Sequence, residues 1–402
     1  MPSSARVRKT ACLFTAPGND SIAIMNRRAF LLSALSATRS AAAPPNRKIL
    51  VTLWDGFGPE YLERSEMPNL KRLIASGFHK IADGVIPSVT NVNNTSLVTG
   101  CFPEEHGITT NFYFDPSSGE SRPMEDARFV LKPTIFERAA RHGYKSAIIS
   151  AKHKVRTLCS RGAHLQASAE QPSPEWIAKA GPAPNMYSPE SNYWIFRAAR
   201  HAFRHDGVNL LYLSTTDYMM HTYAPEEAPS LEHLHNVDKL LGDLAADNPG
   251  LEIYLTADHG MNAKTEAIDP SLVLRRHGIE SEAVPIIRDK HKVHHGNLGG
   301  ACYIYLANPA DLTKAAAILR ETEGIEEVYN RRAAAREFRL YPSRIGDLFI
   351  LARKRSAFGN LEREREPAKV RTHGSRYEAK VPILAYGRKV NGADYRYNLD
   401  LT

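Results

Sequence analysis

The sequence predicts an α/β fold in which a largely parallel sheet is flanked by helices. From Lys48 onward, short runs of β-branched and other apolar residues alternate with amphipathic segments, as in repeated βαβ units. Three of the apolar runs also lead directly into an acidic or histidine-bearing loop, the place where parallel sheets bind their ligands. With 402 residues of which 43% are hydrophobic, the chain can bury a substantial core.

The elements of this sheet follow one another regularly along the chain. Short apolar or β-branched runs bounded by polar residues are expected to be strands, at residues 49–54, 146–150, 208–214, 252–256 and 381–386. Segments whose apolar residues recur every three or four positions are expected to be helices, at residues 67–75, 134–141, 192–204, 231–246 and 312–321.

The pattern changes between residues 267 and 367. Short strands expected at residues 303–306, 328–330 and 347–351 alternate there with short helices, and the charged loop 361–370 bounds this part. We therefore expect a small α+β cap at 267–367, inserted into a core made of residues 44–266 and 368–402.

The amino terminus has the layout of a bacterial export signal. Within residues 25–43, Arg27-Arg28 precedes a short apolar stretch and a small-residue end at Ala43, which resembles the twin-arginine type. We expect residues 1–43 to be this signal, Met25 to be the true start and the protein to be periplasmic. The alternative is a basic amphipathic tail on a cytoplasmic protein.

Charge and cysteine content exclude several classes of protein. The net charge is +8, from 52 basic and 44 acidic residues, but residues 1–43 hold six of the basic residues and one acidic residue, so the rest carries only +3. Without a basic stripe, nucleic-acid binding is not expected. No apolar run reaches the roughly 18 residues needed to span a bilayer, so no integral membrane segment is expected. Four cysteines without C-x-x-C spacing do not indicate a disulfide framework or a thiolate site.

Three aspartates follow the ends of predicted strands. Asp55, Asp217 and Asp258 come after the strands at 49–54, 208–214 and 252–256, so we expect them to converge. His221 lies four residues after Asp217, close enough in a helical turn for both to reach one ion, and His259 follows Asp258. Such ligands suit Zn²⁺, with Mn²⁺ or Fe²⁺ as competitors. Taken alone, Asp217 and His221 also fit a solvated helix face.

A hydroxyl-rich turn lies at residues 87–100. It leads into a predicted helix and contains Thr90, whose hydroxyl would lie near free backbone N–H groups that favour phosphoryl oxygens. A metal would lower the pKa of this hydroxyl and make it a nucleophile. The alternative is that Thr90 only caps the helix.

These motifs together resemble the alkaline phosphatase superfamily, in its nucleotide pyrophosphatase/phosphodiesterase branch. The resemblance runs from about residue 48 to residue 387, on Asp55-Gly, Thr90 before Leu-Val-Thr-Gly100, Glu-His106-Gly-Ile, Asp217-x-x-x-His221, Asp258-His259-Gly-Met and His373-Gly. Other stretches are similar to phosphonoacetate hydrolases, such as Pro87-Ser-Val-Thr-Asn-Val-Asn-Asn, Asn111 with the following aromatic run, Ala151-Lys-His-Lys154, Ala257-Asp-His-Gly-Met-Asn-Ala-Lys264 and His294-His-Gly-Asn. Thr109-Thr110 replaces the Cys-Gly expected before Asn111.

The resemblance implies an alkaline-phosphatase-like fold with two divalent metal ions. It assigns Asp217, His221 and His373 to one ion, and Asp55, Asp258 and His259, with Thr90 beside them, to the other. It also implies that Thr90 is the nucleophile and that Asn111 holds a phosphoryl oxygen. Lys264 and His294 or His295 are expected to line the pocket without an assigned role.

The expected activity is hydrolysis of phosphonoacetate to acetate and phosphate through a phosphothreonine intermediate. Lys152 and Lys154, alternate residues after the strand at 146–150, would hold the substrate carboxylate, although both also fit a solvated basic turn.

The main alternative is an exported phosphodiesterase or nucleotide pyrophosphatase that uses the same site. A sulfatase is disfavoured because the Cys/Ser-x-Pro-x-Arg pattern is absent. A non-catalytic metal or phosphonate binder is the third alternative. The expected partner is a small anionic substrate, and the expected state a monomer or homodimer.

Overall fold

The computed structural model describes residues 47–288 and 295–402. The expected export signal and His294 lie outside these described residues. Within them, no helix is both long and apolar enough to cross a bilayer.

A seven-stranded sheet forms the centre of the molecule. Its order is β2-β16-β8-β1-β7-β5-β6. Five strands run parallel to one another: β1 (Ile49–Leu53), β5 (Ser146–Ser150), β6 (Leu165–Ser168), β7 (Leu210–Ser214) and β8 (Glu252–Thr256). At one edge, β16 (Lys380–Tyr386) is antiparallel to both β8 and β2 (Phe78–Asp83). The predicted largely parallel α/β sheet is therefore confirmed, with an antiparallel edge.

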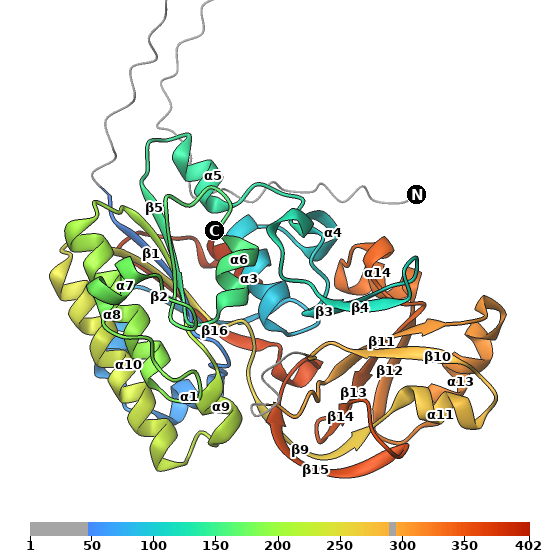
Figure 1. Cartoon of the computed structure of the whole chain (residues 1–402). Coiled ribbons are helices and arrows are strands. Elements are labelled where there is room, and N and C mark those ends of the chain that lie inside the picture. Colours follow the sequence, from blue (N-terminus) through green and yellow to red (C-terminus); the bar gives the residue numbers. More distant parts are fainter. Residues whose placement is uncertain (1–46, 289–294) are drawn as a thin grey trace, which may run out of the picture.

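Helices cover both faces of this sheet (Figure 1), which is why the central strands are apolar throughout. Ile49 and Val51 of β1 pack with apolar residues of α3 (Thr90–Thr99), α5 (Ile135–Ala140) and α6 (His153–Cys159). Leu50 of the same strand faces the other way, in one apolar cluster with the helices of the opposite layer. Those helices are α2 (Pro68–Ser76), α7 (Pro174–Ala180), α8 (Glu190–His205) and α10 (Ala228–Asp247).

Two smaller sheets lie beside the core, between Asn262 and Thr372. One has the order β10-β11-β13-β12 and is antiparallel throughout; it comprises β10 (Ser281–Pro285), β11 (Ala301–Leu306), β12 (Ile325–Asn330) and β13 (Leu348–Ala352). Helices α11 (Pro270–Arg276) and α13 (Leu312–Glu321) share an apolar cluster with it, and α14 (Arg331–Phe338) follows β12. The other sheet contains β9 (Asn262–Ile268), β14 (Ser356–Phe358) and β15 (Arg365–Thr372). These sheets extend a few residues beyond 267–367 on both sides.

Several short helices and one hairpin connect the central sheet to the two smaller sheets. They are α1 (Pro59–Arg64), α4 (Pro103–His106), α9 (Tyr218–Thr222) and the hairpin of β3 (Phe112–Asp115) with β4 (Glu120–Pro123).

The three central strands end at the same level. In the pairing of β1 with its two neighbours, Leu53 lies opposite Ser214 of β7 and opposite Thr256 of β8. Asp55, Asp217 and Asp258 follow within three residues of these ends. The sheet register therefore brings all three carboxylates to one place, as parallel pairing requires.

Candidate active site

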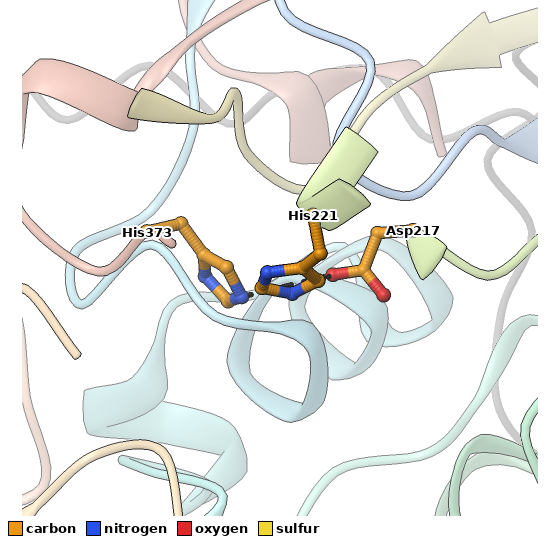
Figure 2. Close-up of side chains that lie close together, drawn as sticks. All are labelled: Asp217, His221 and His373. Carbon is orange, nitrogen blue, oxygen red and sulfur yellow. Dashed lines mark ion pairs between the residues drawn. The ribbon is translucent and has the colours of Figure 1, made fainter. Parts of the chain in front are cut away.

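The first cluster of potential metal ligands consists of Asp217, His221 and His373, whose side chains point toward one another in Figure 2. Asp217 precedes α9 and His221 lies four residues later on it, so His221 Nε2 is 3.0 Å from Asp217 Oδ2. His373 follows β15, and its Nε2 is 3.8 Å from the same oxygen. All three residues are buried.

A second cluster shares Asp217 and adds Asp55 and His259. His259 Nε2 lies 3.4 Å from Asp55 Oδ1 and 3.3 Å from Asp258 Oδ2. The imidazole rings of His259 and His373 stack, with centroids 3.4 Å apart and an interplanar angle of 10°. The six residues that the resemblance assigned to two ions therefore lie in two adjoining groups that share Asp217, with Asp258 beside His259.

Each of the three histidines points its Nε2 atom toward the carboxylates of the clusters. Nδ1 of His221, His259 and His373 lies 2.6, 3.0 and 2.7 Å from a backbone carbonyl oxygen; these belong to Arg371, Gly260 and Ser88. Donation of the Nδ1 proton to these carbonyls leaves Nε2 as the lone-pair nitrogen, the arrangement that orients histidines in metal sites.

The charges of the buried carboxylates compete with one another. Burial and the charges of Asp217 and Asp258 raise the pKa of Asp55 well above its ordinary value, and burial raises that of Asp258 to about 6. Burial alone would also raise the pKa of Asp217, but Lys152 and His221 hold it well below its ordinary value. Burial lowers the pKa of His259 and His373, so both rings are neutral ligands at neutral pH.

These residues fit divalent metal ions. Among the described residues, Asp55 Oδ1, Asp258 Oδ2 and His259 Nε2 are buried polar atoms without a hydrogen-bond partner. A buried polar atom in that condition is destabilising unless a ligand or cation satisfies it. Mixed carboxylate and imidazole donors in two overlapping groups suit a pair of borderline cations such as Zn²⁺.

Thr90 is the first residue of α3, and Val89 is the residue that caps this helix. The alternative interpretation, in which Thr90 only caps the helix, is therefore wrong, because Val89 holds the cap position. Asn94 fixes the start of α3, because its Nδ2 donates to the Thr90 carbonyl at 2.9 Å while its Oδ1 accepts from Tyr212 and Ser214 of β7. The Thr90 hydroxyl lies at the positive end of the helix dipole, in the cavity that also contains Asp217 and His373.

Asn111 lies in the same cavity, in the loop before the β3–β4 hairpin. Its Oδ1 accepts a hydrogen bond of 2.9 Å from the backbone N–H of Asn91, the second residue of α3. Because the oxygen is engaged in this way, the Nδ2 donors remain for a phosphoryl oxygen. The preceding loop is held by the antiparallel part: Thr109 Oγ1 donates to the Arg344 carbonyl, and Tyr303 Oη donates to the Thr109 carbonyl.

Lys152 lies between the two clusters. Its Nζ is 2.6 Å from Asp55 Oδ2 and 2.7 Å from Asp217 Oδ1, and the side chain is buried. Burial alone would lower the pKa of Lys152, but these two carboxylates raise it above the ordinary lysine value. The sequence pattern gave no sign of this ion pair, because its partners are more than 60 residues away.

Lys152 and Lys154 do not alternate along a strand as expected. Strand β5 ends at Ser150 and α6 begins at His153, so Lys152 caps this helix and Lys154 is its second residue. Both side chains nevertheless line the cavity, as does His295; Lys264 does not. Sequence reasoning missed other residues of the wall, which are Pro123, Glu125, His153, Glu170, Met186, Thr216 and Ile287.

His106, from one of the shared motifs, supports the loop that leads to Asn111. Its Nδ1 accepts from the Ile108 N–H at 3.1 Å, so its Nε2 donates to Ser96 Oγ of α3 at 2.9 Å. Burial lowers the pKa of His106 to about 3, whereas an unfolded histidine titrates near about 6.5. Between these two pH values only the unfolded chain binds a proton at His106, and protonation favours unfolding. The stability that comes from the neutral, buried His106 is therefore fully present above about pH 6.5 and is lost as the pH falls toward 3.

We therefore expect His106→Gln, which keeps a donor for Ser96, to reduce the acid sensitivity of the fold. Between pH 7 and pH 5 the free energy of unfolding should fall by about 2 kcal/mol less in the variant than in the wild type. Urea unfolding of chelator-treated protein at both pH values measures this difference. Equal pH dependence in the two proteins would contradict the assignment.

The sequence matches a known protein family over most of its length. The sequence model of the type I phosphodiesterase/nucleotide pyrophosphatase family matches residues 49–376, which include every proposed ligand. The chain belongs to this family. The resemblance to this branch of the alkaline phosphatase superfamily is thereby confirmed.

Solved structures with the same fold include relatives of two kinds. The phosphonoacetate hydrolase of Sinorhizobium meliloti 1021, solved with phosphonoformate, is 30% identical with a TM-score of 0.80, and the match covers 89% of this chain and 94% of that one. Its complex with phosphonoacetate gives a TM-score of 0.81. Human ectonucleotide pyrophosphatase/phosphodiesterase 5 is 21% identical with a TM-score of 0.66, over 88% and 92% of the two chains, which shows a shared fold.

Sequence relatives match a shorter stretch. Human ectonucleotide pyrophosphatase/phosphodiesterase family member 5 is 28% identical over 251 residues, 59% of this chain and 50% of that protein. A venom phosphodiesterase from Naja atra is 27% identical over 225 residues, 52% of this chain and 25% of that protein. This chain thus aligns with half or less of the length of these relatives.

Proposed function

We propose that the protein is a metal-dependent hydrolase that cleaves the C–P bond of phosphonoacetate and releases acetate and phosphate. One observation carries the proposal. A single cavity contains a helix-terminal hydroxyl, Thr90, a buried carboxylate and imidazole cluster, and two lysines, Lys152 and Lys154. Thr90 and divalent ions held by the cluster would suit a phosphoryl group, and the lysines suit a second anionic group on the same small molecule.

The size of the cavity agrees with a small substrate. Its volume is about 200 Å³, below the roughly 300–1,000 Å³ typical of sites for drug-sized ligands. The relative solved with phosphonoacetate matches nearly the whole described chain, which also supports this substrate.

In the proposed reaction the Thr90 hydroxyl loses its proton to solvent, and its oxygen forms a bond to phosphorus while the C–P bond breaks. The electron pair of that bond passes to carbon and spreads into the carboxylate as an enediolate, and a proton from solvent completes acetate. Water then attacks the phosphothreonine phosphorus, which releases phosphate and restores the hydroxyl. Two divalent ions, for which we propose Zn²⁺ with Mn²⁺ or Fe²⁺ as alternatives, would stabilise charge on the phosphoryl oxygens and lower the pKa of the Thr90 hydroxyl.

The residues of the chain divide this work. The Asn111 Nδ2 group holds a phosphoryl oxygen, and the positive end of the α3 dipole favours that oxygen, while the Asn91 N–H of this helix remains bonded to Asn111 Oδ1. The ammonium group of Lys154 stabilises the charge that develops on the substrate carboxylate. Lys152 adds a second positive charge to the cavity wall, next to the buried carboxylates of Asp55 and Asp217.

The alternative is cleavage of P–O phosphodiesters with the same nucleophile and ligands. The family match favours it, since that family is named for phosphodiesterase and nucleotide pyrophosphatase activities. Such substrates lack the carboxylate, so they give Lys154 nothing to bind. The two proposals therefore differ in how strongly turnover depends on this lysine.

We expect Lys154→Met to lower kcat/KM for phosphonoacetate by about 10–100-fold, the effect of losing one hydrogen bond to a charged group. Turnover of a p-nitrophenyl phosphodiester should change little. The assays are acetate release and p-nitrophenol release by metal-loaded protein, with Lys132→Met, a partly exposed lysine outside the cavity, as control. Diester cleavage without acetate release by the wild type would favour the alternative.

We also propose export by the twin-arginine route, on the basis of Arg27-Arg28. In a bacterium with this pathway, replacement of both arginines by lysine should leave the protein in the cytoplasm. Cell fractionation measures this, and periplasmic protein from both precursors would argue against that route.

A further inference from the structure

A fully buried ion pair lies behind the metal-ligand clusters. Lys264 of β9 and Glu378, at the end of the short 3-10 helix Arg376–Glu378, are 2.9 Å apart from Nζ to Oε1, and both side chains are 0% exposed. Lys264 Nζ also donates to the Lys354 carbonyl at 2.9 Å. Neither residue lines the cavity. Because burial of two charges is as often unfavourable as favourable for stability, fold stability alone does not account for this pair.

Glu378 contacts both segments that carry the stacked histidines. Its Oε2 accepts hydrogen bonds from the backbone N–H and the hydroxyl of Ser375, at 3.0 and 2.7 Å. Its backbone carbonyl accepts from the Gly260 N–H at 2.7 Å. Ser375 lies two residues after His373, and Gly260 directly follows His259. The conformation of this one residue therefore sets where both histidine segments lie.

The contact continues to the ring nitrogen of His373. Ser88 Oγ donates to the Ser375 carbonyl at 2.8 Å, and the Ser88 carbonyl is the oxygen that faces His373 Nδ1. A displaced Ser375 would thus move the group that orients the His373 ring. The space around Ser375 is tight, since a Cβ on Gly300 would lie 2.6 Å from the Ser375 nitrogen.

We propose that Lys264 and Glu378 are positioning residues for the two metal sites. The charge of Lys264 holds the Glu378 carboxylate in place, and Glu378 holds His373 through Ser375 and His259 through Gly260. This gives Lys264, which the sequence motif brought to attention without a role, a function outside the cavity. The inference rests on the metal sites of the proposed function, but it makes no assumption about the substrate.

The test measures metal binding in four forms of the full chain: wild type, Lys264→Met, Lys264→Arg and the double variant Lys264→Met/Glu378→Gln. The double variant leaves no uncompensated buried charge, so it provides the measurement if Lys264→Met does not fold. Zn²⁺ affinity is measured by competition with a chromophoric chelator, and ligand geometry by the visible absorption of Co²⁺-substituted protein. Melting of chelator-treated protein reports on the fold alone.

We expect Lys264→Met and the double variant to bind Zn²⁺ about 10–100-fold more weakly, the range measured for outer-shell partners of metal ligands. Their Co²⁺ spectra should change, and Lys264→Arg should recover part of the loss. The control is Arg47→Met, which breaks the partly exposed ion pair of Arg47 with Glu252, at the end of β8 that lies away from the metal-ligand clusters. This control should leave affinity and spectrum unchanged.

Unchanged affinity and an unchanged spectrum in a folded Lys264 variant would overturn the inference, even if melting were lowered. Failure of the proposed function looks different. A wild-type protein that binds Zn²⁺ but does not cleave phosphonoacetate would refute the substrate and leave the positioning role intact. A wild-type protein that binds no divalent ion would overturn both.

Discussion

Thr90→Ala is expected to lower the turnover of phosphonoacetate by at least about 10³-fold, because the variant lacks the oxygen that attacks phosphorus. The fold should be unaffected. Val89 is the residue that caps α3, and the hydrogen bond from Asn94 goes to the Thr90 backbone carbonyl, which alanine keeps. Turnover at saturating substrate is measured on protein of verified metal content, so that a lost ion is not mistaken for a lost nucleophile.

Two variants make this experiment specific. Thr90→Ser keeps a hydroxyl and should remain active, while Thr95→Ala removes an equally buried hydroxyl from the same helix, outside the cavity, and should leave turnover unchanged. Acid-quenched wild type should yield a phosphorylated peptide that contains Thr90, detectable by mass spectrometry. If metal-loaded Thr90→Ala protein hydrolysed phosphonoacetate as fast as the wild type, the covalent mechanism would be refuted.

The convergence of the three aspartates could be predicted because parallel pairing leaves little freedom. Once Ile49–Leu53 is a central strand with a parallel neighbour on each side, the residues that follow each strand must meet at its carboxyl end. The eight predicted strands and the five helices whose bounds were predicted recur in the structure, with boundary differences of up to three residues. The edge strand β2 and the short β6 have mixed polar sequences and showed no such pattern.

Other parts of the site depend on contacts between distant parts of the chain. His373 reaches the cluster only after the antiparallel sheets have returned the chain to the core, so no local spacing marks it among the 16 histidines; only the family resemblance did. The carbonyls that face Nδ1 of His221 and His373 lie 150 and 285 residues away. Lys152 and Lys154 are expected from the sequence to alternate as a strand-end pair because the sequence shows the strand end at Ser150 but not the helix α6 that begins at His153.

Asp217→Asn is expected to have the second large effect, because Asp217 belongs to both ligand clusters. If Asp217 is a ligand in both clusters, loss of its charge would remove one ligand from each, and it also removes the carboxylate 3.0 Å from His221 Nε2. Changes in partners outside the ligand set weaken metal binding by 10–100-fold. Loss of a shared ligand should therefore weaken Zn²⁺ binding by more than about 100-fold, and hydrolysis of phosphonoacetate should fall with it.

The metal-free variant should still fold, because Lys152 keeps Asp55 as a partner at 2.6 Å and one of three mutually repelling carboxylates is gone. Asp238→Asn is the matched control: Asp238 is as buried as Asp217, but it accepts hydrogen bonds from the backbone N–H groups of Asn69 and Leu70, far from the clusters. That control should melt at a lower temperature and retain its metal. Equilibrium dialysis followed by elemental analysis measures the Zn²⁺ bound by each form. If Asp217→Asn retained two tightly bound ions per chain, the Asp217 carboxylate would not be a shared ligand.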